Sequence, residues 1–137
     1  MDERLRQAIV DHLEEGQLSC HQAHAIAIDL GIGPIEVGLA ADEAGVRIFR
    51  CQLGLFGFGS KADGTHKIAR PMEQVPPQLE AALRGEAGEE GLPCAAMWRI
   101  ADRLGTSRLE VSNAAEGLGL RVSDCQLGCF PRPKKGR

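Results

Sequence analysis

One internal duplication constrains this chain more than any other feature of its sequence. When the sequence is shifted by 74 residues, residues 20–56 align without a gap with residues 94–130, and 16 of the 37 aligned positions are identical. The identities include two cysteines in each copy and the Gln-Leu-Gly that follows the second of them. An internal repeat identifies a structural unit that is used more than once. We therefore expect the two halves of the chain to share one fold.

The duplication divides the 137 residues into modules and connecting segments. We expect module 1 over residues 1–57, module 2 over residues 77–131 and a basic tail over residues 132–137. Residues 58–76 contain several Gly, Ser, Thr and Asp residues and lead into a pair of prolines, a composition that is typical of turns and connections. This segment is predicted to be a linker or a wing.

Each module is predicted to contain three helices followed by one strand. The helical spacing of apolar residues marks a first helix near the start of each module. Ser19 is a suitable N-cap for a second helix that begins at Cys20 and ends at Gly31. A third helix is expected over residues 34–44, and residues 46–51 alternate as a half-buried strand does. The predicted fold class is mainly α with short β-strands.

The second and third helices carry a family resemblance. Ala27-x-x-x-Gly31, with apolar residues on both sides, resembles the helix-turn-helix signature, and Ala101-x-x-x-Gly105 repeats it in module 2. A small Ala lets two helices cross closely, and the Gly turns the chain between them. The opening helix and the closing strand make each module similar to the winged variant. The resemblance covers most of both modules and implies two repeated winged helix-turn-helix-like modules, although a fold alone does not determine a function.

The resemblance implies that DNA, if bound, would be read by the third helix of a module. In module 1 this helix offers small, apolar and acidic residues, which cannot neutralise a phosphate. Its Gly38 and Leu39 face suits packing against another helix, for which the other module is a candidate. Module 1 is expected to serve association with another protein or with itself. Module 2 supplies better candidates. The predicted nucleic-acid-binding residues are Arg99, Arg103, Ser107, Arg108, Ser112 and Asn113, with Lys134 and Lys135 in the basic tail.

Charge and composition exclude several classes of protein. The net charge of −3 does not fit a polycation that coats nucleic acid, although residues 58–137 carry 12 basic and 10 acidic side chains against 4 and 9 in residues 1–57. No apolar run has the length of a transmembrane helix, and the first residues lack the pattern of a secretory signal, so we expect a cytoplasmic protein without a membrane partner. Because no nucleophile elbow, phosphate loop or catalytic carboxylate pair is present, we do not expect an enzyme.

Four of the five cysteines belong to the repeat itself. Cys20 and Cys94 open the second helix of their modules, and Cys51 and Cys125 follow them by 31 residues. Four thiolates are the number preferred by structural zinc sites and by iron–sulfur clusters. These four cysteines, Cys20, Cys51, Cys94 and Cys125, are candidate ligands of one metal site if the modules pack about a pseudo-twofold axis. In the alternative arrangement, each pair helps to hold a smaller site. Buried cysteines are also common as small apolar core residues, and no Cys-x-x-Cys pair is present.

The residues leave two interpretations of the function open. In the first, the chain is a small regulatory or adaptor protein that contacts DNA through module 2. In the second, it is a cysteine-ligated metal-binding protein, with zinc or an iron–sulfur cluster, that acts through protein–protein association. His21 and His24 lie beside Cys20 but have no counterparts in module 2, so they are expected on the surface rather than among the ligands.

Overall fold

The computed structural model describes residues 2–60 and 62–131, which form six helices and four short strands. Module 1 contains α1 (Glu3–Asp11), β1 (Leu18–Ser19), α2 (Cys20–Leu30), α3 (Pro34–Glu43) and β2 (Ile48–Phe49). Module 2 contains α4 (Pro77–Glu86), β3 (Leu92–Pro93), α5 (Cys94–Leu104), α6 (Arg108–Gly117) and β4 (Val122–Asp124). The fold class is mainly α with short strands, as the sequence predicts.

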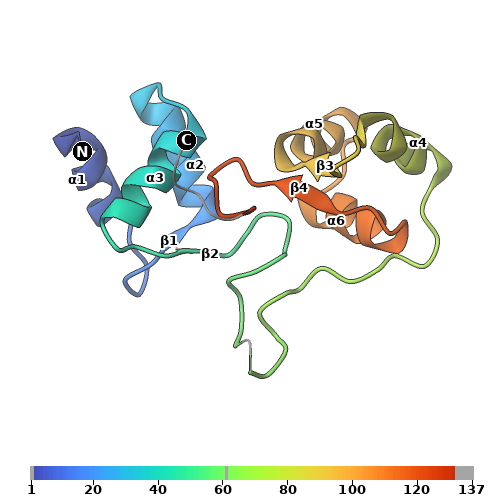
Figure 1. The fold of residues 1–137 in the computed structure, drawn as a ribbon, viewed down its shortest axis with the longest axis horizontal. Coiled ribbons are helices and arrows are strands. Elements are labelled where there is room, and N and C mark those ends of the chain that lie inside the picture. The colour runs from blue at the N-terminus through green and yellow to red at the C-terminus, as the bar shows by residue number, and fades with distance from the viewer. Residues whose placement is uncertain (1, 61, 132–137) are drawn as a thin grey trace.

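The two halves repeat the same order of elements. The start of α5 at Cys94 lies 74 residues after the start of α2 at Cys20, and the other elements of module 2 begin at the same offset. Figure 1 shows two lobes, with α1–α3 on one side and α4–α6 on the other. The basic tail predicted over residues 132–137, with Lys134 and Lys135, lies outside the described residues.

Local signals set the limits of α2. The hydroxyl of Ser19 accepts a hydrogen bond from the backbone N–H of Gln22 at 3.1 Å, which satisfies one of the free donors at the start of the helix. Gly31 ends the helix in the left-handed conformation with φ 67°, which glycine adopts without steric cost. The chain bends by 116° between α2 and α3. The predicted start and end of this helix are confirmed.

The strands are shorter than the sequence predicts. β1 pairs with β2 in parallel, with Leu18 opposite Ile48, and β3 pairs with β4 in the same way. The strand expected over residues 46–51 is reduced to the two residues of β2. The sequence gives no sign of β1, because a strand of two residues shows no alternation.

Each module completes its core with a turn from the other module. We call residues 51–56 turn 1 and residues 125–130 turn 2. Leu53 of turn 1 is fully buried in the core of module 2, against residues of α4, α5 and α6. Leu127 of turn 2 is fully buried in the core of module 1, against residues of α1, α2 and α3. In Figure 1 the chain after β4 runs back to α2 and α3, and the chain after β2 runs toward module 2.

A glycine in α3 allows turn 2 to approach. A Cβ atom added at Gly38 would lie 1.8 Å from the carbonyl oxygen of Leu127, so no side chain fits at this position without moving the turn. The sequence predicts that the small face at Gly38 packs against another helix. The other module does pack there, as the sequence suggests, but through turn 2 rather than through a helix, because turn 2 is exchanged between the modules.

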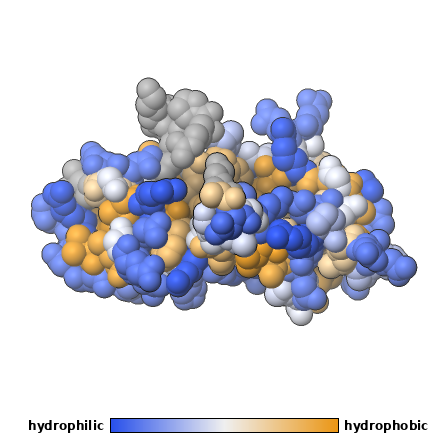
Figure 2. Space-filling model, turned by 90° about the horizontal axis from the view of Figure 1, so that it is seen from below, coloured by the Kyte–Doolittle hydropathy of each residue, from blue (hydrophilic) through white to orange (hydrophobic). Residues whose placement is uncertain are grey.

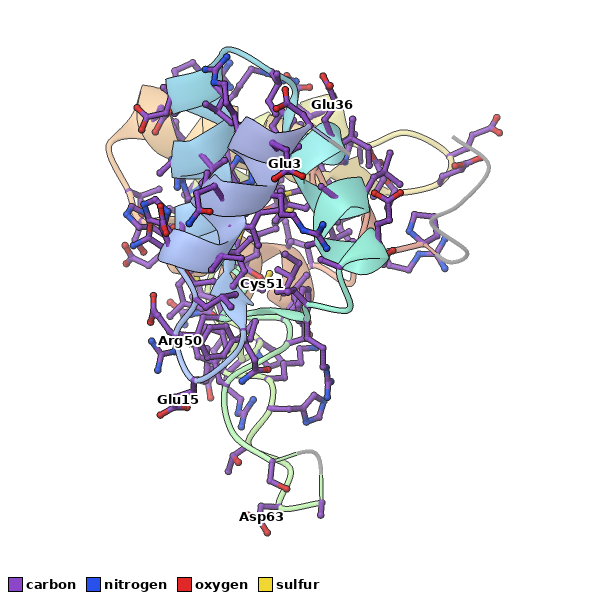
Figure 3. All side chains as sticks on the ribbon, turned by 90° about the vertical axis from the view of Figure 1, so that its left-hand side faces the viewer. Glu3, Glu15, Glu36, Arg50, Cys51 and Asp63 are labelled. Atoms are coloured by element: carbon purple, nitrogen blue, oxygen red, sulfur yellow. The ribbon has the colours of Figure 1, made fainter. Side chains whose placement is uncertain are left out.

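The segment between the modules crosses α6. It first extends away from the helices, with Asp63 at the far end in Figure 3, and then returns to module 2. The backbone N–H of Met72 donates to the carbonyl oxygen of Asn113 at 2.9 Å, and Lys67 forms an ion pair with Glu116. A Cβ atom at Gly117 would lie 2.2 Å from the carbonyl oxygen of Met72. Residues 66–72 therefore cover part of α6.

Hydrophilic residues dominate the face of the molecule in Figure 2, with hydrophobic residues showing between them. Among the described residues, no single helix has both the length and the apolar composition needed to cross a membrane. The pair α2 and α3 meets these criteria together by length and composition, but the chain is sharply bent between them.

We predict that Gly38→Ala lowers the free energy of unfolding by roughly 1–3 kcal/mol, because the added methyl group overlaps the Leu127 carbonyl and displaces turn 2. The matched control is Gly85→Ala in α4, where an added Cβ has no atom within 4 Å. That change should be neutral or stabilise the helix by up to about 1 kcal/mol. Urea unfolding followed by circular dichroism measures both. Equal effects of the two substitutions would contradict the exchange of turn 2.

Candidate thiol site between the modules

The four repeated cysteines come from two helix starts and two exchanged turns. Cys20 and Cys94 are the first residues of α2 and α5, while Cys51 and Cys125 open turn 1 and turn 2. Because the turns are exchanged, Cys51 shares the core of module 2 with Cys94, and Cys125 packs on the core that contains Cys20. Figure 3 shows Cys51 in the interior, whereas the adjacent Arg50 points outward. The fold thus gathers all four at the junction of the modules.

These thiols influence one another electrostatically. Burial raises the pKa of the Cys20 thiol most strongly, and negative charge on the other three repeated cysteines raises it further. Burial also raises the pKa of Cys94 to about 11, and charge on Cys125 and Cys51 adds to the shift. These mutual effects act through a region that excludes water, where charges influence one another over longer distances than in solvent.

Glutamines that follow the turn cysteines donate hydrogen bonds to the helix cysteines. The side-chain Nε2 of Gln126 donates to the Sγ of Cys94 at 3.4 Å, and the Gln126 backbone N–H donates to the same sulfur. The backbone N–H of Gln52 donates to the sulfur of Cys20. Both hydrogen bonds favour the charged thiolate and oppose the effect of burial.

The turn cysteines accept hydrogen bonds from their own turns. The Cys51 sulfur accepts from the backbone N–H groups of the second, third and fourth residues after it. The Cys125 sulfur accepts from the equivalent three N–H groups, including that of Leu127 at 3.3 Å. A Cys-Gln-Leu-Gly turn therefore surrounds its sulfur with donors. Hydrogen bonds to cysteine sulfurs are one means by which proteins stabilise and tune thiolate-bound metals.

The pKa values of Cys125 and Cys51 shift in opposite directions despite the equivalent positions of these residues. A hydrogen bond from the Cys129 thiol is the largest of the effects that lower the pKa of Cys125 to about 6, and they outweigh its burial. Cys51 has Leu55 in place of Cys129, so burial dominates there and raises its pKa. The hydrogen-bonded pair Cys125 and Cys129 therefore loses its first proton at a lower pH than Cys20, Cys51 or Cys94.

No metal-binding arrangement is ready-made at this junction. Within residues 2–60 and 62–131, no three His, Cys, Asp or Glu side chains are grouped so that they could hold a metal ion. Binding therefore requires the sulfur atoms to move toward one another. Rotation about the Cα–Cβ bond is the movement available to a cysteine. The donor set itself, four thiols with N–H groups directed at them, suits a thiophilic metal.

Two pairs of aromatic side chains pack across the junction of the modules. His24 and Trp98 occupy equivalent positions in the repeat, and their ring centroids lie 4.3 Å apart across it. Phe56 and Phe130, also equivalent, meet edge to face at 6.3 Å. The expectation that His24 lies on the surface is wrong, because Trp98 of the other module covers it and leaves it only 9% exposed. His21 is exposed, as the sequence predicts.

The predicted nucleic-acid-binding residues on α6 contact other parts of the chain. The Arg108 guanidinium lies 3.5 Å from the centroid of the Trp98 ring, and its Nη1 donates to the side-chain oxygen of Gln52 at 3.1 Å. Ser112 is buried. The side-chain oxygen of Asn113 accepts from the backbone N–H of Arg70 at 2.8 Å. The side chain of Arg108 therefore takes part in joining the modules, and that of Asn113 holds the segment between them.

The remaining candidates for nucleic-acid binding lie on other surfaces. Ser107 is the N-cap of α6, and its hydroxyl accepts from the backbone N–H of Glu110 at 3.0 Å. Arg99 forms an exposed ion pair with Glu86 at 3.6 Å, and Arg103 is exposed in the last turn of α5. Within the described residues, the predicted nucleic-acid-binding residues therefore do not form one surface. Some lie at or near the junction of the modules, and the others lie on the outer face of module 2.

The repeat marks four further residues whose roles could not be predicted from their residue types alone. Gln52 and Gln126 donate to sulfur, and Leu53 and Leu127 complete the opposite cores. All four lie in the identical Gln-Leu-Gly that follows the second cysteine of each copy. Their identity between the copies is visible from the sequence, whereas their exchange between the modules depends on long-range packing.

Comparison with protein-family models, with curated proteins and with solved structures finds no match to this chain. The chemistry and geometry of the junction are therefore the basis for assigning a function.

We predict that His24 makes the protein less stable in mild acid. Burial, reinforced by the positive charge of Arg108, lowers the pKa of His24 to about 4 from the ordinary value of about 6.5. As the pH falls from 6.5 to 4, the unfolded chain binds a proton that the folded chain does not, so the free energy of unfolding decreases. Replacing the histidine with an uncharged ring should remove this part of the pH dependence.

Urea midpoints at pH 7 and pH 5 measure the effect in the wild type, in His24→Phe and in His21→Phe. The His24→Phe variant should lose less stability between the two pH values than the wild type. His21→Phe is the matched control at an exposed position of the same helix and should retain the wild-type difference. An unchanged difference in His24→Phe would contradict the assigned cause.

Proposed function

We propose that this protein binds a thiophilic metal, as a zinc ion or an iron–sulfur cluster, between its two modules. The ligands are the four repeated cysteines. One observation carries the proposal: the exchanged turns place Cys51 in the core that contains Cys94 and Cys125 against the core that contains Cys20, and N–H groups donate to the sulfurs of Cys94 and Cys125. The metal would cross-link the two modules at the place where each inserts a turn into the core of the other.

Apolar packing alone does not account for this environment. A neutral thiol is only a weak hydrogen-bond acceptor, so donors directed at a sulfur stabilise the thiolate much more than the thiol. Burial and mutual repulsion act in the opposite direction and raise the pKa of Cys20, Cys51 and Cys94. A bound cation removes both costs, because it neutralises the thiolates and replaces their lost hydration.

We propose further that each module is a winged helix-turn-helix-like unit used for assembly. The 116° bend between α2 and α3 and the left-handed Gly31 support this interpretation of the fold. The third helix of each module packs against segments of the same chain, through Gly38 in α3 and through Asn113 in α6. These contacts favour association over DNA reading. A reducing cytoplasm suits the five free cysteines.

We predict that the reduced protein binds one metal centre per chain through the four repeated cysteines. The probe is Co²⁺, whose tetrahedral tetrathiolate complexes show intense visible bands and a near-ultraviolet sulfur-to-cobalt charge-transfer band. Titration under anaerobic conditions should give these bands, and Zn²⁺ should remove them by displacement. Metal analysis of the purified protein, with its absorption spectrum, distinguishes zinc from an iron–sulfur cluster.

The matched variants are Cys51→Ser, which removes a repeated cysteine, and Cys129→Leu, which places at turn 2 the residue found at the same position of turn 1. Cys51→Ser should weaken metal binding by more than about 100-fold, since even the loss of a supporting residue costs about 10–100-fold. Cys129→Leu should retain the tetrathiolate spectrum. Circular dichroism checks that both variants fold. Loss of the bands in Cys129→Leu, or their persistence in Cys51→Ser, would overturn the assigned ligand set.

A further inference from the structure

The fifth cysteine breaks the symmetry of the repeat. Turn 2 is closed by hydrogen bonds from the Cys125 N–H to the Phe130 carbonyl at 2.9 Å and from the Gly128 N–H to the Cys125 carbonyl at 3.0 Å. Turn 1 has the equivalent pair of hydrogen bonds, at 3.2 Å and 2.9 Å. The two turns therefore share one backbone conformation. They differ at the fifth position, where turn 1 has Leu55 and turn 2 has Cys129.

This conformation holds two thiols in contact. The closed turn brings the fifth residue back beside the first, and the Cys129 thiol donates a hydrogen bond to the sulfur of Cys125. Both cysteines are half-buried, unlike the three other repeated cysteines, which are buried. The two thiols that would form a covalent bond are therefore partly exposed and already hydrogen-bonded to each other.

A pocket leads from solvent to Cys129, one member of this pair. Cys129 and Phe130 line an open pocket of about 520 Å³, together with β2 and the loop before it. The equivalent pocket of module 2 has a volume of about 310 Å³, and turn 1 contributes Leu55 and Phe56 to it in place of a thiol. The chain thus gives a small molecule access to a thiol in one of two related pockets.

We propose that Cys125 and Cys129 form a reversible disulfide by exchange with a low-molecular-weight disulfide that enters this pocket. The thiolate of one cysteine attacks the small disulfide, forms a mixed disulfide and releases one small thiolate. The second cysteine thiolate then attacks the protein sulfur of the mixed disulfide, closes the Cys125–Cys129 bond and releases the other small thiolate. Two protein thiols are oxidised by two electrons, the small disulfide is reduced to two thiols, and the two cysteine protons pass to these products.

The exchange would control the proposed metal centre, and in this respect it rests on the proposed function. A disulfide at Cys125 withdraws one of the four ligands, so a bound metal loses a thiolate and is released. Cys129 cannot replace Cys125 as the fourth ligand, because it is held in the same disulfide. Only three cysteine ligands therefore remain for the metal.

The test uses the full chain loaded with Zn²⁺ and treated anaerobically with oxidised glutathione, while a chromogenic chelator reports released zinc. Wild type should release its zinc, and a tryptic peptide carrying both cysteines should lose two hydrogens and resist alkylation. Cys129→Leu, which copies turn 1, should retain its zinc under the same conditions. Equal zinc release by Cys129→Leu and wild type would overturn the proposal, as would a disulfide located between other cysteines.

The mass measurement separates this proposal from the metal site. If the reduced wild type binds no zinc, the proposed function fails. Oxidised glutathione should still convert the metal-free chain to the Cys125–Cys129 disulfide, and a reducing agent should reverse it. Unmodified or merely glutathionylated cysteines in that experiment would overturn the redox proposal on its own.

Discussion

The mutual insertion of two turns holds this molecule together. The core of each module includes a fully buried leucine from the other copy, which is Leu53 in module 2 and Leu127 in module 1. Neither leucine can be removed from water unless both modules are present and correctly placed. The hydrophobic contribution of each is about 1.5–3 kcal/mol by area alone. The modules are therefore expected to unfold as one cooperative unit rather than independently.

The same insertion creates the chemistry of the junction. A cysteine precedes each inserted leucine by two residues, so seating the leucine also places the cysteine beside the helix start of a neighbouring module. The N–H groups of the turn then point at the sulfur, because the turn closes around it. The insertion of each turn into the other module thus both completes a core and positions a cysteine at the junction. Cys129 alone departs from this symmetry, and it lies where an open pocket reaches the turn.

Local features were predictable from the sequence, and long-range ones were not. The N-cap at Ser19, the turn at Gly31 and the helical class follow from residues within a few positions of each other. The exchange of turns, the cover that Trp98 provides for His24, and the segment that crosses α6 depend on residues more than 30 positions apart. The four candidate ligands were found because the repeat marked them, whereas the role of Gln52 and Gln126 required the fold.

Sulfur coordination in the metal-loaded protein tests the central claim most directly. X-ray absorption spectroscopy of the zinc-loaded full chain reports the number and type of ligands around the metal. The account predicts a first shell of four sulfur atoms at about 2.3 Å, without nitrogen or oxygen. A shell of two or three sulfurs completed by nitrogen or oxygen would contradict it.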